Sequence, residues 1–285
     1  MVNIATIVVT YNRIDLLKEC IDSLLNQNYK DFDILIIDNA STDGTKDFVL
    51  SLSSSKIKYY NTGSNIGGAG GFNFGLRKAY EEGYEYYWLM DDDSIPEKDA
   101  LEKMIKASDD LKEYGFLASK VNWIDGTLCQ MNIPDFINEN NNGYKRITRA
   151  TFVGFFLNKE VLIKIGLPIK EFFIWADDTN YSLRINKEYN NYYVEDSIIV
   201  HKMKTNSSAD IVHDKSGRYS RYYYAFRNRY YNARLNKKRM RYLLGIIKKT
   251  ILILVIGSHK FKRWFYMYKG FFAGLRFKPK VEYLE

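Results

Sequence analysis

Three consecutive aspartates, Asp91, Asp92 and Asp93, directly follow a run of aromatic and apolar residues at positions 86–90. The run is typical of a buried strand, so the carboxylates must reach solvent or a cation where the strand ends. Mg²⁺ or Mn²⁺ takes oxygen ligands and is often bound by one or two carboxylates together with substrate phosphates. The pattern therefore indicates a divalent-metal site, although a solvated acidic turn would give the same sequence.

A second acidic pair, Asp177 and Asp178, stands between the aromatic stretch 172–175 and a helical pattern. Carboxylates at the start of a helix are stabilised by its dipole, and this structural role would account for the pair. A carboxylate can also take a proton from a hydroxyl group during catalysis. The residues alone leave both roles open.

A glycine-rich segment, residues 65–73, lies between a predicted strand and a predicted helix. Glycines allow backbone N–H groups to approach a ligand, and a helix N-terminus favours an anion. The segment has neither the Gly-Lys-Ser/Thr of a P-loop nor the glycine spacing of a dinucleotide fingerprint. It predicts a ligand contact of another kind, or only a tight turn from strand to helix.

The elements that position these motifs alternate between strand and helix. Such alternation implies a parallel sheet with right-handed crossovers, whose ligands bind beyond the carboxyl ends of the strands. That rule brings together the loops 10–12, 38–41, 65–71 and 91–93. From periodicity and turn residues we expect strands at 4–10, 32–37, 57–61, 86–90, 116–121, 151–157 and 192–200, helices at 14–27, from Ser41 or Thr42 to about Leu52, and from Pro96 to about Asp109, and a polar loop with some hairpin content at 130–148.

Composition and charge divide the chain into two regions. Hydrophobic residues make up 46% and aromatic residues 16%, which is enough for a packed core. Residues 1–214 carry 23 basic and 32 acidic residues, a net charge of −9, whereas residues 215–285 carry 19 and 2, a net charge of +17. Two distant cysteines favour a reducing compartment, and no signal peptide is evident. We expect a catalytic domain at 1–214 and a basic helical region at 215–285.

The basic region interleaves arginine with tyrosine between residues 218 and 234. This pattern would suit nucleic acid, but no recognisable nucleic-acid motif accompanies it. The apolar stretch 243–257 is broken by two lysines and is too short to span a bilayer, and basic residues then alternate with large aromatics. The region predicts an interfacial anchor on an anionic membrane surface, while a helical appendage with a solvated basic face is the alternative.

Several motifs, in order, resemble the inverting glycosyltransferases of family 2 with the nucleotide-sugar (GT-A) fold. They are Thr10-Tyr11-Asn12-Arg13, then Asp38-Asn39-Ala40-Ser41-Thr42-Asp43-Gly44, then the three aspartates. The resemblance covers roughly residues 1–205. The glycine-rich segment and the piece 223–228 are similar to galactofuranosyltransferases and, less closely, to rhamnosyltransferases of that family. The implied fold class is α/β, with a mostly parallel sheet flanked by helices.

The resemblance implies a role for each motif. A divalent metal, Mn²⁺ or Mg²⁺, would bridge the donor diphosphate and neutralise the leaving group. Asp178, with Asp177 as the fallback, would take the proton of the acceptor hydroxyl. By similarity, the donor would be bound by Thr10, Tyr11, Arg13, Asp38, Asn65, Gly67, Gly68, Asp91 and Asp92, the metal by Asp91, Asp93 and His201, and the acceptor by Trp175 and Gly154. Structural alternatives are that Asp38 caps a turn, Gly154 only permits packing, Trp175 belongs to the core, and His201 is an ordinary polar residue at a strand end.

The expected activity is transfer of a hexose, in the first place galactofuranose from UDP-galactofuranose, to a polysaccharide or polyprenyl-linked glycan in the assembly of bacterial surface polysaccharide such as capsule or O-antigen. A rhamnosyltransferase using dTDP-rhamnose is the alternative within the family. A non-catalytic protein that binds nucleotide or RNA through its tyrosine-arginine segment is the alternative from another class. We expect a cytoplasmic protein at the inner face of the membrane, with no nucleic-acid partner, which could form a homo-oligomer.

Overall fold

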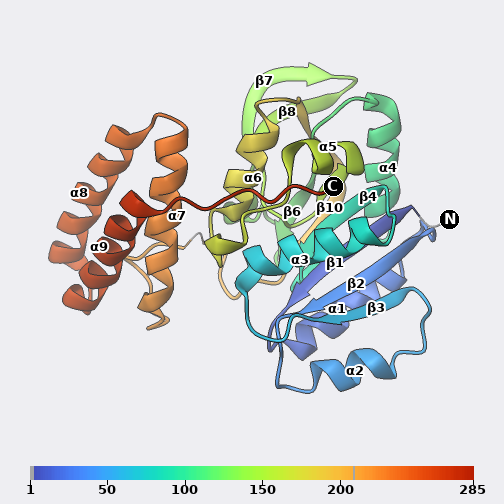
Figure 1. The fold of residues 1–285 in the computed structure, drawn as a ribbon, viewed down its shortest axis with the longest axis horizontal. Coiled ribbons are helices and arrows are strands. Elements are labelled where there is room, and N and C mark those ends of the chain that lie inside the picture. Colours follow the sequence, from blue (N-terminus) through green and yellow to red (C-terminus); the bar gives the residue numbers. More distant parts are fainter. Residues whose placement is uncertain (1–2, 208) are drawn as a thin grey trace.

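The computed structural model describes residues 3–207 and 209–285, and its centre is one β-sheet with helices on both faces (Figure 1). The strands are β1 Ile4–Thr10, β2 Phe32–Asp38, β3 Ile57–Asn61, β4 Tyr86–Asp91, β5 Ser94–Pro96, β6 Leu117–Trp123, β7 Asp135–Asn141, β8 Tyr144–Arg149, β9 Phe155–Asn158 and β10 Asn191–His201. The helices are α1 Ile14–Leu25, α2 Thr45–Ser51, α3 Gly67–Glu81, α4 Ala100–Leu111, α5 Lys159–Ile165, α6 Asp177–Ile185, α7 Tyr222–Leu235, α8 Arg239–Ile256 and α9 Lys260–Arg276.

The sheet is mixed. Its order is β3-β2-β1-β4-β9-β6-β10-β8-β7, and β5 pairs with β10 beside this path. The first four strands in that order are parallel, as predicted, and β10 is parallel to β6. The β9 strand runs antiparallel to both neighbours, and β5, β7 and β8 also form antiparallel pairs. The parallel arrangement expected for most of the sheet therefore holds only for its N-terminal part and the β6–β10 pair.

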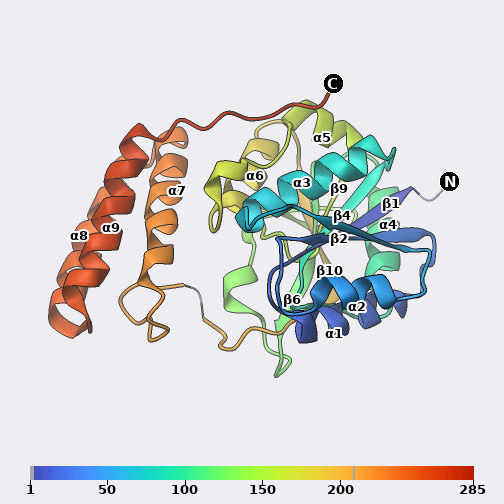
Figure 2. The ribbon, with the colours of Figure 1, turned by 60° about the horizontal axis from the view of Figure 1, so that its bottom comes forward.

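Alternating residues of the central strands build a core on each face of the sheet. In β1, Ile4 and Val8 face one core, whereas Ala5, Ile7 and Val9 face the other. The first core is closed by α1, α2 and α4, and the second by α3, α5 and α6. Figure 2 shows α1 and α2 on one side of the sheet and α3 and α5 on the other. This three-layer arrangement holds the strand ends that carry the acidic motifs.

Some predicted boundaries were wrong for identifiable reasons. Pro96 ends β5, a short strand paired with β10, and the next helix begins at Ala100. Neither Ser41 nor Thr42 caps α2, which begins at Thr45 after left-handed Gly44. The Thr45 backbone N–H and hydroxyl instead donate to the Asp43 carboxylate, at 3.2 and 2.6 Å. In the strand expected at 151–157, the left-handed turn at Gly154 delays β9 until Phe155.

Helices α7, α8 and α9, residues 222–276, form a C-terminal helical unit with its own small core. In both ribbon views α7 lies between α6 and the other two helices (Figures 1 and 2). The α9 helix packs closely on α7 because Gly270 and Gly274 have no side chains; a Cβ at Gly270 would lie 2.4 Å from the Tyr223 carbonyl oxygen. No helix among residues 3–207 and 209–285 has the length and apolar character needed to cross a membrane.

The segment after α9 returns to the sheet domain in extended form (Figure 2). The Leu167 backbone N–H donates to the Glu282 carbonyl oxygen at 2.8 Å, and the Glu282 carboxylate pairs with Arg77 on α3 at 2.9 Å and with Lys170. The helical unit is thus connected to the sheet domain both before α7 and after α9.

Candidate active site

Four polar loops meet at the carboxyl ends of β1, β2, β3 and β4, as the strand order predicts. The Thr10 hydroxyl donates to Asp92 Oδ2 at 2.8 Å, and the Asn39 backbone N–H donates to the Thr10 carbonyl at 3.0 Å. The Asn39 side-chain amide also donates to the Gly67 carbonyl at 3.2 Å, which ties in the glycine-rich segment. These hydrogen bonds join residues more than 80 positions apart into one crevice wall.

Asp91, Asp93 and His201 form a cluster in which one ligand atom from each lies within 4.8 Å of the others. Strand register explains the cluster, because His201 on β10 pairs with Ser94 on β5, the residue after Asp93. His201 Nε2 lies 3.0 Å from Asp93 Oδ1. Two carboxylates and an imidazole suit Mn²⁺ well, since it accepts both oxygen and nitrogen ligands. The chemistry of this donor set fits a divalent metal.

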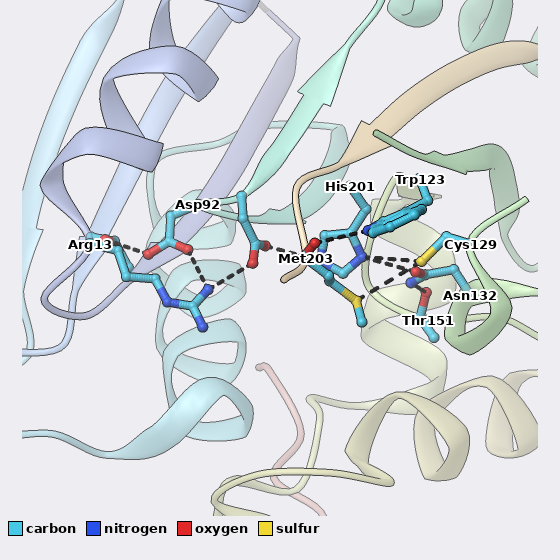
Figure 3. A network of polar contacts seen from close by, with 10 residues as sticks. Arg13, Asp92, Trp123, Cys129, Asn132, Thr151, His201 and Met203 are labelled. Carbon is cyan, nitrogen blue, oxygen red and sulfur yellow. Dashed lines mark hydrogen bonds and ion pairs between the residues drawn. The ribbon is translucent and has the colours of Figure 1, made fainter. Parts of the chain in front are cut away.

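The Arg13 guanidinium joins two of the aspartates. Its Nη1 donates to Asp93 Oδ2 at 2.8 Å and to Asp92 Oδ1 at 3.2 Å (Figure 3). Burial raises the pKa of Asp92 to about 6, and the Arg13 charge opposes that shift. Burial raises the pKa of Asp91 to about 7, with the charge of Asp93 adding to the effect. Three carboxylates this close together favour a further positive charge.

His201 is held in one orientation by residues on its far side (Figure 3). The Asn132 amide donates to the Thr151 hydroxyl at 2.7 Å, so its oxygen faces His201 Nδ1 at 2.9 Å. An Nδ1–H donating to Asn132 leaves Nε2 directed toward Asp93 and the metal cluster. Although burial would lower it, the hydrogen bond with Asp93 raises the pKa of His201 to about 10. Asn132 lies in the segment predicted only as a polar loop with some hairpin content, and no pattern in the sequence indicates this contact.

Two predicted donor residues have structural partners. Asp38 is buried, accepting from the Ser41 backbone N–H at 2.8 Å and from the Tyr59 hydroxyl at 2.6 Å. Asp38 therefore does cap the turn, which was the structural alternative. The Asn65 side chain likewise accepts from the Gly67 backbone N–H at 2.9 Å. Tyr11, in contrast, is exposed.

The glycine-rich segment serves packing more than the ligand contact we expected. Gly67 has φ +75°, and a Cβ there would lie 2.0 Å from the Phe173 carbonyl oxygen. That carbonyl accepts from the Ala69 backbone N–H at 3.2 Å, so one N–H of the first turn of α3 is already used. Gly71 and Gly75 let α3 lie directly on Val9 and Ile7. At Gly68, by comparison, no atom of the described residues lies within 4 Å of a Cβ position.

Asp177 and Asp178 open α6 after Ala176, which has the left-handed φ of +64°. Burial raises the pKa of both carboxyls. The charge of Asp178 adds to the rise at Asp177, whereas the charges of Arg149 and Arg229 oppose it at Asp178. The charge of Asp91 also contributes to the raised pKa of Asp177.

The two predicted acceptor residues differ in accessibility. Trp175 is partly exposed, with Tyr222 on α7 at 5.2 Å between ring centroids and the Arg221 guanidinium 5.1 Å from its ring. Gly154 is buried, and a Cβ there would lie 2.5 Å from Ile199 and 2.7 Å from the Ser119 hydroxyl. The expectation that an acceptor lies against Gly154 was wrong, because its surface is filled by the protein itself.

The fold is that of the GT-A glycosyltransferases, enzymes that transfer a sugar from a nucleotide-sugar donor. A model of glycosyl transferase family 2 matches residues 6–166, more than half of the chain, and the chain belongs to that family.

Two characterised relatives match over about a third of the chain. Galactofuranosyltransferase GlfT1 of Mycolicibacterium smegmatis is 31% identical over 93 residues, which are 33% of this chain and 30% of that protein. The GalNAc(5)-diNAcBac-PP-undecaprenol beta-1,3-glucosyltransferase of Campylobacter jejuni is 38% identical over 96 residues, again 33% and 30%. Both matches cover less than a third of the relative.

Solved structures share the fold at low sequence identity. Mannosyltransferase PcManGT from Pyrobaculum calidifontis, in complex with GDP-Man and Mn²⁺, superposes with a TM-score of 0.60 at 15% identity over 96% of this chain and 86% of that one. Staphylococcus aureus TarS 1–349 with UDP-GlcNAc gives 0.56 at 15% identity, over 96% and 73%.

Proposed function

We propose that this protein is a metal-dependent, inverting hexosyltransferase that moves galactofuranose from UDP-galactofuranose to a membrane-linked glycan. The observation that carries the proposal is the cluster of Asp91, Asp93 and His201 at the carboxyl end of β4. These residues would hold Mn²⁺ or Mg²⁺. When bound, the metal would supply positive charge against the diphosphate leaving group.

The donor assignment rests on the crevice and on the relatives. Thr10, Tyr11, Arg13 and Asp38 would bind the nucleotide, while Gly68 has the open backbone that a phosphate or sugar could approach. The M. smegmatis relative is named a galactofuranosyltransferase, which supports that sugar over rhamnose, while the C. jejuni relative, named a glucosyltransferase, makes glucose a further donor to test. Residues 1–214 would form the catalytic domain, and residues 215–285 the membrane-facing region.

The chemistry proposed for the acidic pair is removal of one proton. Asp178 takes the proton of the acceptor hydroxyl while that oxygen bonds to the anomeric carbon and the bond to UDP breaks on the opposite face, which inverts the configuration. A base must be ionised to accept a proton, and Arg149 and Arg229 favour the ionised form of Asp178. Asp177 is the second candidate, because burial and the charge of Asp178 raise its pKa and so disfavour its ionised form. Trp175 would contribute an acceptor surface.

The proposed partner on the acceptor side is an anionic bilayer at the cytoplasmic face. Exposed apolar residues form a stripe on the outer side of α8 and continue on α9, among many basic side chains. Such a surface matches anionic lipid in both apolar character and charge. The C. jejuni relative is named for an undecaprenol-linked substrate, which supports a lipid-linked acceptor. The stripe comprises Met240, Leu244, Ile247, Ile251, Leu254, Val255, Phe261, Phe265 and Phe272.

The tyrosine-arginine segment does not favour RNA binding. Tyr222, Tyr230 and Tyr231 on α7 are buried, and Arg227 is 9% exposed and stacks on Phe277 at 4.1 Å. These side chains are used inside the protein and cannot stack on bases. The pattern that suggested nucleic acid is explained by packing of the helical unit.

The test is UDP binding by calorimetry, with and without Mn²⁺, on the wild type, Asp93→Ala and Asp125→Ala. Asp125 is an exposed turn residue and serves as the acidic control. We expect UDP to bind the wild type and Asp125→Ala only with Mn²⁺, and Asp93→Ala to lose the metal effect. Metal-independent UDP binding by the wild type would contradict the proposal. Donor hydrolysis with UDP-galactofuranose, UDP-glucose and dTDP-rhamnose then identifies the sugar.

A further inference from the structure

The segment before the acidic pair has an unusual backbone. Phe173, Trp175 and Ala176 have φ values of +63°, +68° and +64°, in the left-handed region that non-glycine residues rarely adopt. Three such residues within four positions persist only where surrounding structure holds them. Asp177 and Asp178 follow directly, so the conformation of this loop, residues 172–176, sets the direction in which the acidic pair leaves it.

The first support for the loop is Asn228 on α7. Its side-chain amide nitrogen lies within hydrogen-bond distance of three loop carbonyl oxygens, those of Phe172 at 2.9 Å, Ile174 at 3.1 Å and Trp175 at 2.9 Å. Arg227 Nε donates to the Asn228 side-chain oxygen at 2.9 Å, which fixes the orientation of the amide. Asn228 is fully buried, so water cannot replace these contacts.

The second support is Asn232, one turn further along α7. Its amide nitrogen donates to the Ala176 carbonyl at 2.9 Å, and its oxygen accepts from the Asn180 side chain on α6 at 2.9 Å. The Ala176 carbonyl also accepts from the Asn180 backbone N–H at 3.0 Å in the first turn of α6. Asn232 therefore joins the last loop residue and the helix carrying the acidic pair.

The loop is also fixed from the donor side. The Phe173 carbonyl accepts from Ala69 in the glycine-rich segment, and its ring stacks on Tyr224 of α7 at 4.8 Å. The loop is thus held between the glycine-rich segment and α7. A shift of α7 would move the acidic pair relative to the donor crevice.

We propose that Asn228 and Asn232 are positioning residues for the acidic pair, and that α7 is thereby part of the acceptor side of the active site. Neither residue touches substrate. Each acts by holding the left-handed loop that directs Asp177 and Asp178. The expected effect on sugar transfer rests on the proposed function. The support of loop 172–176 by α7 does not.

The test compares wild type, Asn228→Ala, Asn232→Asp and a control, Asn236→Ala. Asn232→Asp removes the donor to Ala176 but keeps an acceptor for Asn180. Asn236 directly follows the last residue of α7, and among the described residues its side-chain amide donates only to the Asn232 carbonyl. Amide hydrogen exchange of residues 172–180 can be measured without substrate. We expect exchange at least tenfold faster than in the wild type for Asn228→Ala and Asn232→Asp. The control, Asn236→Ala, should exchange at the wild-type rate.

The rate of sugar transfer is measured in parallel. It is divided by the concentration of sites that bind UDP in the presence of Mn²⁺. We expect kcat to fall at least tenfold in Asn228→Ala and Asn232→Asp, with the UDP dissociation constant within twofold of the wild type. A merely structural role would lower the number of binding sites and leave kcat per site unchanged, and that result would overturn the inference. If Asn228→Ala binds no UDP, Asn232→Asp decides. A wild type that transfers no sugar contradicts the proposed function, while the exchange data still decide whether the loop is held by α7.

Discussion

Asp93 links Arg13 and His201, because each of its carboxylate oxygens has one of these side chains as a partner. Oδ1 faces His201 at 3.0 Å and Oδ2 accepts from Arg13 at 2.8 Å. Although burial would raise it, these partners hold the pKa of Asp93 below its ordinary value. A metal held by Asp93 and His201 would supply positive charge beside the one that Arg13 now provides.

Asn132 is expected to tune metal affinity through His201. Asn132→Ala removes the acceptor for Nδ1 and frees the imidazole to rotate. Loss of such an outer partner typically weakens metal binding by about 10–100-fold. Calorimetry with Mn²⁺ should show this loss, and Asn122→Ala, in the neighbouring β6 strand, is the comparison. Unchanged Mn²⁺ affinity in Asn132→Ala would mean that the hydrogen bond does not orient the ligand.

Replacing the proposed base should separate catalysis from binding. Asp178→Asn keeps the size of the side chain but cannot accept the proton, so kcat should fall by about 10²–10⁴-fold while UDP still binds with Mn²⁺. Asp177→Asn should have the smaller effect. Steady-state kinetics with separate UDP titrations checks this, and the reverse order would assign the base to Asp177.

The protonation of Asp177 should appear in the pH dependence of stability. Burial, aided by Asp178, raises the pKa of Asp177 to about 8, so the folded protein retains a proton that the unfolded chain releases near pH 4. The resulting stabilisation is complete at acid pH and is lost as pH rises toward 8. Asp177→Asn mimics the protonated form. Its Tm, relative to the wild type in EDTA, should rise from pH 5 to pH 8; a constant difference would contradict the shift.

At the scale of elements, periodicity predicted the N-terminal strands and helices well because their residues alternate cleanly between the two cores. It failed at Pro96, where pairing with β10 overrides the preference of proline for a helix start. The clustering of Asp91, Asp93 and His201 was predictable because strand ends converge and the family motif is specific. Asn132, Asn228 and Asn232 were not, because asparagine contacts with distant carbonyls leave no periodic trace.

The glycines also show what the sequence alone cannot predict. A glycine in the sequence marks a need for space or for positive φ but does not say whether a ligand or another part of the chain fills that space. At Gly67 the Phe173 carbonyl fills it, and at Gly154 Ser119 and Ile199 do. Only packing in three dimensions distinguishes these cases.

The contact of α9 with α7 predicts opposite effects at two glycines of the helical unit. Gly270→Ala places a methyl group against the Tyr223 carbonyl, which should lower the free energy of unfolding by about 1–3 kcal/mol. Gly245 on α8 has no described atom within 4 Å of a Cβ position, so Gly245→Ala should raise it by roughly 0.5–1 kcal/mol through helix propensity. Urea unfolding measures both, and equal effects would contradict the close packing.

For the whole molecule, the main asymmetry is that the acidic region carries the crevice while the basic region carries the exposed apolar stripe. Replacing both Ile247 and Leu254 on α8 by glutamate should weaken binding to vesicles containing phosphatidylglycerol by roughly tenfold or more. Leu50→Glu, at an exposed position on α2, is the control. Co-sedimentation at low and high salt measures it. Equal binding to neutral vesicles, or a dimer dispersed by the glutamates, would contradict the assignment.

The return of the chain to α3 has a consequence for biosynthesis. Glu282 bonds Arg77 across 205 positions, and α7 supports a loop more than 50 positions before it. During translation the sheet can form as its strands leave the ribosome. The acidic pair gains the support of α7 only after residue 232 has emerged. The contact of α3 with Glu282 forms only after residue 282 has emerged. The support of the acidic pair is therefore complete before α8 and α9 leave the ribosome, whereas the contact of Glu282 with α3 forms only after both helices have emerged.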